Sequence, residues 1–283
     1  MSAGFPDQVR QLHSMSYHNP GSLPDGAVLV VGSGASGAQI AEELVTSGRR
    51  TFLCLSRHRR VPRRLLGREI TNWLVDLGLM DRSRADWVGG RMPPTVLVTG
   101  VDGGHDLDLR DLGERGVTLL GSLSGVTGDF VDFADDAEQI LAAADTMYDE
   151  LVRQCYQHAG LVAPSNAGAI RPEPPPLRSS ISLSASGISS VIWATGYDFD
   201  FDWLHAPVLD ESGEPVQRRG ISRAAGLYFL GLHWMVTFKS GTFMGIGDDA
   251  DHVTDHLADL VCSYRGGNPD AVGTEAAARS RDE

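Results

Sequence analysis

The stretch from Ala27 to Ser47 reads AVLVVGSGASGAQIAEELVTS and decides the fold. Its first part, Ala27 to Gly32, is a continuous apolar and β-branched run, which is the pattern of a strand buried on both faces. Residues 35–47 are predicted to form a helix, because apolar side chains recur on one helix face and Gly48 follows. A second apolar run at Thr51 to Leu55 completes a β-α-β unit of about thirty residues. The fold class is therefore predicted to be α/β with a parallel sheet.

The turn between the first strand and the helix matches the pattern G-x-G-x-x-G. In this context Gly32 permits a tight turn, Gly34 lets the backbone approach a pyrophosphate, and Gly37 lets helix and strand pack closely. The phosphates would lie on the free N–H groups at the amino end of the helix. A glycine-rich turn without a ligand is the alternative. The predicted cofactor-binding residues of this segment are Gly32, Ser33, Gly34, Ala35, Ser36, Gly37 and Gln39.

The end of the second strand indicates which dinucleotide binds. A site for NAD usually carries Asp or Glu there, which accepts a hydrogen bond from the ribose 2′-hydroxyl. This chain instead has Ser56-Arg57-His58-Arg59-Arg60, with no carboxylate. Guanidinium groups suit a 2′-phosphate, so we expect NADP(H), held by Ser56, Arg57 and Arg59. A solvated basic loop is the alternative interpretation.

Composition argues against several classes of partner and site. The net charge of the 283 residues is −13, which argues against nucleic acid and anionic membranes as partners. Lys239 is the only lysine, so a catalytic lysine is not expected. The three cysteines form no Cys-x-x-Cys pair, and we expect no metal site and no disulfide framework. Because neither a signal peptide nor a membrane-spanning run is recognisable, a cytoplasmic setting is predicted.

Outside the β-α-β unit, the pattern predicts further elements. Helices are expected at 68–79, 135–158 and 248–264, and strands at 96–99, 117–121, 191–195 and 227–232. Residues 125–133 alternate like a strand with a turn at 127–129, and the proline-rich stretch 170–177 reads as an extended connector. The expected domains are a linker at 1–25, an NADP-binding Rossmann-like domain at 26–190, a C-terminal region at 191–265 and a disordered tail at 266–283.

Three segments together resemble a known family. The segment from Val191 to Tyr197 is similar to the strand-end Ala-Thr-Gly-Tyr motif of flavoproteins with two dinucleotide sites. The segment from Leu227 to His252 resembles their C-terminal strand, glycine-rich turn and closing helix. Gln11 to Ser14 with Tyr17 resembles the linker of flavin-containing monooxygenases. Their order along the chain is that of class B flavoprotein monooxygenases.

The resemblance implies a Rossmann-like NADP-binding domain followed, at 191–265, by the C-terminal part of an FAD-binding domain. This part would be the remnant of a two-dinucleotide-binding flavoprotein fold. It implies that NADPH reduces FAD and that the reduced flavin oxygenates a small organic substrate. Ala194, Thr195 and Gly196 would line the passage between the two cofactors, and three glycines would lie near the flavin: Gly231, Gly245 and Gly247. His13 is interpreted either as a packing residue of the linker or as a site residue. No catalytic residue is assigned.

One departure from the family pattern leaves several functions open. No second G-x-G-x-x-G is present, whereas these enzymes begin with one that carries most FAD contacts. We therefore expect either a truncated monooxygenase or one completed by a separate FAD-binding polypeptide or a homo-oligomer. The alternatives are an NADP(H)-binding module without redox activity, acting as a sensor or partner subunit, and another NADPH-dependent flavin reductase. A short-chain dehydrogenase is disfavoured, because Lys239 has Met235 rather than Tyr four residues before it.

Overall fold

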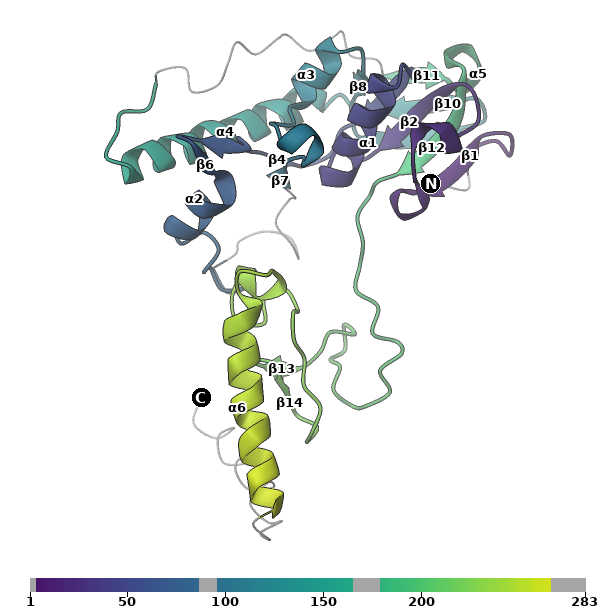
Figure 1. The fold of residues 1–283 in the computed structure, drawn as a ribbon. Coiled ribbons are helices and arrows are strands. Elements are labelled where there is room, and N and C mark those ends of the chain that lie inside the picture. The colour runs from purple at the N-terminus through teal and green to yellow at the C-terminus, as the bar shows by residue number, and fades with distance from the viewer. Residues whose placement is uncertain (1–3, 87–95, 165–178, 266–283) are drawn as a thin grey trace. The chain divides into compact units, whose positions relative to one another are not determined.

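The computed structural model describes residues 4–86, 96–164 and 179–265 (Figure 1). They form two compact units, which are described separately below. Unit 1 contains the chain up to Tyr197, except for a segment between Leu74 and Gly90. Unit 2 contains that segment together with the chain from Asp198 onward.

Unit 1 is built on a five-stranded sheet in which every neighbouring pair is parallel. The strand order is β1-β12-β2-β3-β8. The register places Val31 opposite both Cys54 and Trp193, so the carboxyl ends of the three central strands lie level. The strands in sheet order are Arg10–His13, Ile188–Trp193, Ala27–Val31, Thr51–Cys54 and Thr118–Leu120.

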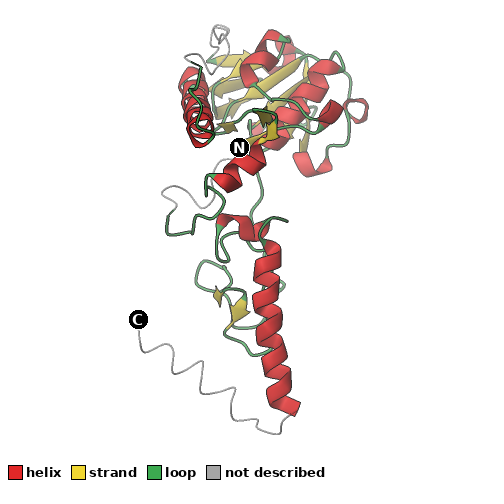
Figure 2. Ribbon diagram, turned by 60° about the vertical axis from the view of Figure 1, so that its left-hand side comes forward, coloured by secondary structure: helices red, strands yellow, loops and turns green. Residues whose placement is uncertain are grey.

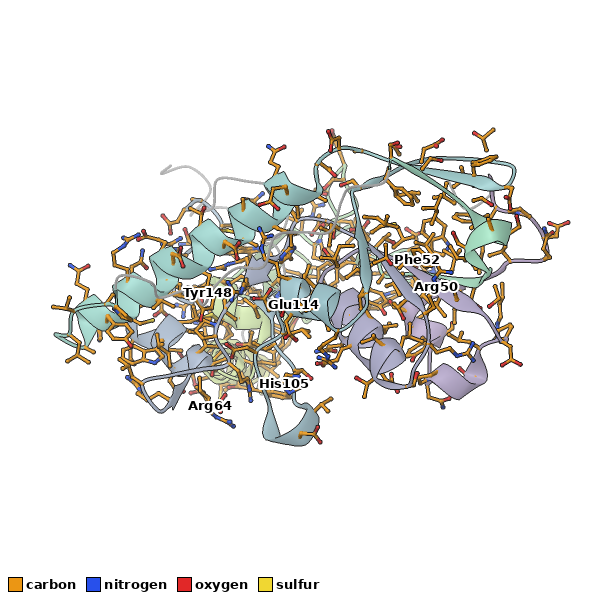
Figure 3. All side chains as sticks on the ribbon, turned by 90° about the horizontal axis from the view of Figure 1, so that it is seen from above. Arg50, Phe52, Arg64, His105, Glu114 and Tyr148 are labelled. Atoms are coloured by element: carbon orange, nitrogen blue, oxygen red, sulfur yellow. The ribbon has the colours of Figure 1, made fainter. Side chains whose placement is uncertain are left out.

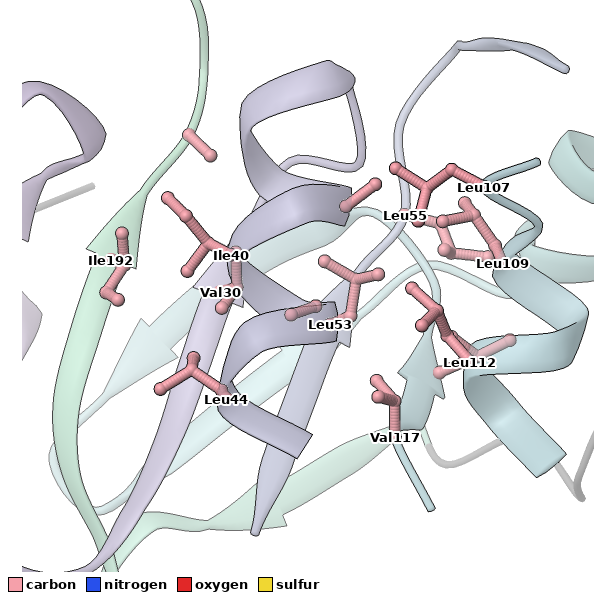
Figure 4. Close-up of a cluster of buried hydrophobic side chains, with 14 of the residues drawn as sticks. Val30, Ile40, Leu44, Leu53, Leu55, Leu107, Leu109, Leu112, Val117 and Ile192 are labelled. Carbon is pink, nitrogen blue, oxygen red and sulfur yellow. The ribbon is translucent and has the colours of Figure 1, made fainter. Parts of the chain in front are cut away.

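Alternate residues of these strands enter two separate hydrophobic cores, because successive side chains point to opposite faces of a sheet. Val30, Leu53 and Ile192 point to the face covered by helix α1 (Ala35–Thr46), as Figure 4 shows. Helix α3 (Leu109–Glu114) packs on the same face. All five strand residues of β2 are buried, which confirms the doubly buried strand that the sequence predicts.

The opposite face is covered by a three-stranded antiparallel sheet with the order β11-β10-β9. The strand pattern predicted for 125–133 is an antiparallel hairpin, β9 (Leu123–Thr127) and β10 (Phe130–Phe133), and the third strand is β11 (Ser180–Ser182). Val131 and Phe133 from β10 pack against the parallel sheet. Unit 1 is therefore layered, and Figure 2 shows its strands in yellow beside its helices in red.

The long helix α4 (Ala137–His158) confirms the helix predicted at 135–158, and one of its faces is buried. Met147 is exposed, whereas Asp145 is buried. Helix α2 (Ile70–Asp76) begins in unit 1 and ends in unit 2. The shorter elements that complete unit 1 are β4 (Arg59–Arg60), β5 (Arg64–Leu65), β6 (Arg68–Glu69), β7 (Val96–Leu97), α5 (Leu183–Ser186) and the 3₁₀ turns at Ser14–Ser16, Pro20–Ser22 and Val101–Gly103.

Two expectations about the chain's division differ from the structure. β12 lies between β1 and β2, so the boundary expected at 190 is displaced to Tyr197. β1 lies within the expected 1–25 linker and is the edge strand of the same sheet. The connector expected at 170–177 and the tail at 266–283 lie outside the described residues.

Unit 2 contains the two-stranded pair β13 (Gln217–Arg218) and β14 (Ile221–Ser222), a 3₁₀ turn at Phe238–Gly241 and the helix α6 (Ile246–Arg265). Helix α6 confirms the helix predicted at 248–264. The small hydrophobic core of unit 2 contains Val208, Phe229 and Met235. Lys239 forms an ion pair with Asp81 at 2.7 Å, which joins the 74–90 segment to the rest of the unit.

The prediction of a strand at 227–232 is wrong. Tyr228 makes only an isolated bridge with Ile221, and the run then turns at Gly231, whose φ of +79° lies in the left-handed region. The apolar run therefore ends before a ladder can form. No helix within the described ranges combines the length and the apolar character needed to cross a membrane.

Candidate nucleotide site

The glycine-rich turn lies at the point where the sheet order reverses. From β2 the chain moves to β3 on one side, whereas β12 pairs with β2 on the other side. In open α/β sheets, ligands bind outside the carboxyl ends of strands at such a switch point. The turn at 32–37 follows β2, and Ala194, Thr195 and Gly196 follow β12. The structure thus brings two predicted segments to one edge.

Two glycines of the turn are required by close backbone contacts. Gly32 has φ +102°, and a Cβ on it would lie 2.5 Å from the carbonyl oxygen of Ala194. A Cβ on Gly37 would lie 1.8 Å from the carbonyl oxygen of Gly32 and 3.2 Å from the Cβ of Ala194. The glycine turn and the Ala-Thr-Gly segment are therefore packed directly against each other.

The amino end of α1 is suited to an anion. Gly34 precedes the helix, and no described side chain caps its first N–H groups. The first turn holds Ala35 and Ser36 and no acidic residue, and Ser36 is exposed. The positive end of the helix dipole is thus open to a phosphate. The predicted contact Gln39 is exposed, but its amide donates to the carbonyl of Val98 at 2.8 Å.

Ser33 and Ser56 bond to each other rather than pointing outward. The Ser33 hydroxyl donates to the Ser56 carbonyl at 3.0 Å and accepts from the Ser56 N–H at 2.8 Å. The Ser33 N–H donates to the Ser56 hydroxyl at 2.9 Å. Ser33 is fully buried, so this geometry gives it no direct contact with a ligand, contrary to the expectation from its place in the motif.

The arginine-rich segment after β3 is divided by its contacts. Arg57 is exposed and makes no ion pair or hydrogen bond through its side chain to any residue in the described parts of the chain. His58 is buried, which lowers the pKa of its imidazole. Arg59 is half-buried and lies in β4. Of the predicted phosphate ligands, Arg57 is thus the one presented to solvent.

Arg60 is held inside unit 1 by acidic groups. Its guanidinium forms ion pairs with Asp108 at 2.6 Å and Asp145 at 2.9 Å, and it lies 4.3 Å from the ring centre of Tyr148. Figure 3 shows Tyr148 on α4. Arg110 also contacts Asp145, at 3.2 Å. This network was not predicted from the sequence, although an aspartate on the apolar stripe of a helix is a usable signal for a buried ion pair.

The linker motif packs against the segment that follows β12. His13 Nε2 lies 3.3 Å from the carbonyl oxygen of Gly196, and the His13 ring meets the Tyr197 ring edge-on at 4.9 Å between centres. The Ser14 hydroxyl lies 3.3 Å from the Tyr197 hydroxyl. Of the two interpretations of His13, the geometry supports packing that positions the Ala-Thr-Gly-Tyr segment.

The three remaining predicted residues belong to unit 2. A Cβ on Gly231 would lie 3.3 Å from Ile246 Cδ1, and a Cβ on Gly245 would lie 2.6 Å from the carbonyl oxygen of Lys239. Gly247 lies in the first turn of α6, where a Cβ would meet no described atom within 4 Å. Gly231 and Gly245 are therefore closely packed, whereas Gly247 has open space around it.

The chain has recognisable relatives in sequence. No protein-family model matches it. It is 28% identical over 258 residues to an uncharacterized CzcO-like oxidoreductase of Geobacillus kaustophilus, covering 89% of the chain and 58% of that protein. It is 27% identical over 259 residues to the uncharacterized oxidoreductase CzcO of Bacillus subtilis, covering 91% and 60%. The chain is thus similar in sequence to proteins named as CzcO-like oxidoreductases.

Solved structures show the same fold. A flavin-containing monooxygenase from Stenotrophomonas maltophilia superposes with a TM-score of 0.52 at 16% identity, over 92% of the chain and 57% of that protein. A mutant flavin monooxygenase from the same organism gives 0.51 at 16% identity, over 90% and 56%. The predicted α/β fold is confirmed. The chain spans about 56 to 60% of the length of the relatives it matches.

Proposed function

We propose that this chain binds NADPH at the carboxyl edge of the parallel sheet and acts in a flavoprotein monooxygenase. Arg57 carries the proposal: an exposed guanidinium without a side-chain partner among the described residues follows β3, in a loop that is bonded to the glycine turn. Because guanidinium groups bind phosphate with charge-assisted hydrogen bonds, Arg57 suits the 2′-phosphate.

The other proposed contacts with NADPH also lie at the carboxyl edge of the parallel sheet. The pyrophosphate would lie on the amino end of α1, where the N–H groups after Gly34 are uncapped by any described side chain. Ala194, Thr195 and Gly196 would border the nicotinamide end, because they follow the neighbouring strand β12. NADPH supplies a hydride when bound. The residues of unit 1 hold its adenosine and phosphates in place.

The fit to FAD is incomplete in this chain. The sequence has a single G-x-G-x-x-G turn, which the proposal assigns to NADPH. In unit 2, Trp234 Nε1 and His233 Nδ1 are buried without a partner among the described residues, but Asp248 and Asp249 occupy the first turn of α6. These carboxylates compete with an electron-rich group for the helix amino end. We therefore propose that FAD is held jointly with a separate FAD-binding polypeptide, and that the substrate is a small organic molecule.

The proposal is tested by titrating the purified chain with NADPH and NADH and comparing Arg57→Ala. Loss of a charge-assisted contact of about 1.5–3 kcal/mol should weaken NADPH binding by roughly 10- to 100-fold and change NADH binding by less than about 2-fold. Arg153→Ala is a matched control, because Arg153 is an exposed arginine on α4 paired with Glu150. Equal affinity of the native chain for NADPH and NADH would contradict the proposal.

Redox activity is tested separately with FAD. The visible spectrum of the purified chain, and NADPH oxidation in air after FAD is added, distinguish the two main alternatives. Flavin absorbance with NADPH oxidation supports the monooxygenase. A colourless chain that binds NADPH and oxidises none of it supports the NADP(H)-binding module.

A further inference from the structure

The strongest unexplained feature of the nucleotide edge is the mutual bonding of Ser33 and Ser56. Three hydrogen bonds of 2.8 to 3.0 Å connect them. One further bond lies just before them, from the Gly32 N–H to the carbonyl of Cys54 at the end of β3, at 3.1 Å. Ser33 has no exposed surface, so its hydroxyl does not reach a ligand, and both of the hydrogen bonds described for it go to Ser56.

The two loops have different tasks in the proposed site. The loop that contains Ser33 would carry the pyrophosphate, and the loop that begins at Ser56 carries Arg57. In NADPH, the pyrophosphate and the 2′-phosphate are carried by one ribose, so their separation is restricted to a limited range. A protein that grips both groups therefore gains affinity if its two loops are held at the matching separation beforehand.

We propose that Ser33 is a positioning residue that sets the preference for NADPH over NADH by fixing the loop of Arg57 to the glycine turn. This inference rests on the proposed function. The Ser56 carbonyl also accepts from His58 Nδ1 at 2.9 Å, and Arg60 is fixed by Asp108 and Asp145. The loop is thus held on both sides of Arg57, and the Ser33 bonds are what connect it to the pyrophosphate turn.

The decisive measurement is the ratio of the NADH to the NADPH dissociation constants in Ser33→Ala. This variant removes the hydroxyl that bonds to both the N–H and the carbonyl of Ser56. We expect NADPH binding to weaken by about 5- to 20-fold, as for two lost hydrogen bonds, and NADH binding by less than about 2-fold. A variant that merely loosened the fold would weaken both ligands alike. An unchanged ratio would overturn the inference.

A matched control comes from the antiparallel sheet of unit 1. The Ser182 hydroxyl in β11 donates to Asp129 and accepts from the Ala185 N–H at 3.0 Å. Ser182→Ala removes a half-buried serine hydroxyl that, like that of Ser33, both donates and accepts, and its partners Asp129, Ser184 and Ala185 lie outside the glycine turn and the loop of Arg57. The preference of this variant for NADPH over NADH should equal that of the native chain. A fall equal to that of Ser33→Ala would contradict a specific role for Ser33.

A double-mutant cycle with Arg57→Ala separates positioning from an independent effect. If Ser33 acts by positioning Arg57, the double variant is no weaker toward NADPH than Arg57→Ala alone. Additive losses would mean that Ser33 affects NADPH binding independently of Arg57, which would overturn the inference. Should Ser33→Ala fail to fold, Ser56→Ala alone carries the test through the same ratio. If the native chain shows no preference for NADPH, the proposed function itself fails, whatever the variants do.

Discussion

The guanidinium of Arg60 donates to the carboxylate of Asp145 at 2.9 Å, with 12% and 4% of the two side chains exposed. Arg110 shares the same carboxylate at 3.2 Å. Replacing Asp145 with Ala would leave two guanidinium groups without this partner in a largely buried setting. Arg60 keeps Asp108 and Arg110 keeps Glu138, so the change removes two charge-assisted hydrogen bonds of about 1.5–3 kcal/mol each. We expect a loss of about 3–6 kcal/mol in the free energy of unfolding, measured by urea denaturation.

An exposed aspartate on α3 provides the comparison for Asp145. Asp111 pairs with Arg115 at 3.6 Å, and 58% of its side chain is exposed. Such surface pairs contribute about 0–1 kcal/mol, so Asp111→Ala should hardly move the urea midpoint. Equal destabilisation by the two substitutions would show that the Asp145 network does not stabilise unit 1 in the way its burial implies.

Gly37 is predicted to tolerate no side chain. A Cβ there would lie 1.8 Å from the carbonyl oxygen of Gly32, and backbone atoms cannot move aside as a flexible side chain does. Gly37→Ala should therefore separate α1 from β2, abolish detectable NADPH binding and lower the thermal midpoint by several degrees, which corresponds to about 1 kcal/mol or more. Calorimetry and ligand titration measure both effects.

The control for Gly37 is a glycine with free space. Gly125 lies in β9, where a Cβ would meet Asp132 Oδ2 at an ordinary 3.8 Å. Gly125→Ala should leave NADPH binding unchanged. Normal NADPH binding by Gly37→Ala would contradict the close packing of helix and strand at the turn.

His105 makes stability depend on pH through its contact with Glu42. Its Nε2 lies 2.8 Å from Glu42 Oε1, to which Arg115 also donates at 2.8 Å. The hydrogen bond to Glu42 raises the pKa of His105. Burial alone would raise the pKa of Glu42, but the bonds from Arg115 and His105 outweigh it and lower that pKa. Figure 3 marks His105, 41% of whose side chain is exposed.

The sign of the effect follows from these two directions. A raised histidine pKa stabilises the folded chain below the unfolded value of about 6.5, and that stabilisation is lost as the pH rises through the folded pKa. The lowered pKa of Glu42 stabilises the folded chain above the ordinary carboxyl pKa of about 4.5, and that stabilisation is lost on acidification. The advantage of the native chain over His105→Gln in thermal midpoint should thus be larger at pH 6 than at pH 8.5. A constant difference would contradict this assignment.

The central part of the fold could be predicted because each element carries its own signal. The apolar run of β2, the glycine turn and the amphipathic α1 are specified by residues within the same 21-residue stretch. β1 could not be predicted, since its sequence Arg-Gln-Leu-His has little strand character and its conformation depends on pairing with β12. The prediction of a strand at 227–232 was wrong for the converse reason. The sequence there has strand character, but it forms no ladder with another strand among the described residues.

The site was predictable in its position but not in its detailed contacts. The motif places Gly32, Gly37 and Arg57 at one sheet edge, because parallel strands end there together. The sequence assigns Arg57 and Arg59 to the 2′-phosphate, but only the structure shows that Arg59 is half-buried in β4 and that the distant Asp108 and Asp145 hold Arg60 as a packed residue. Likewise, Ser33 resembles any variable position of the motif until its bonds to Ser56 are seen.

Two neighbouring glycines in unit 2 should respond oppositely to alanine. A Cβ on Gly247 has no neighbour within 4 Å and lies in the first turn of α6, so Gly247→Ala should stabilise the helix by up to about 1 kcal/mol. A Cβ on Gly245 would lie 2.6 Å from the Lys239 carbonyl oxygen, so Gly245→Ala should destabilise the turn before the helix. Hydrogen exchange of the α6 amides measures both, as slower exchange for Gly247→Ala and faster exchange for Gly245→Ala. The same direction for both variants would contradict the packing of Gly245 on Lys239, because only that contact distinguishes the two positions.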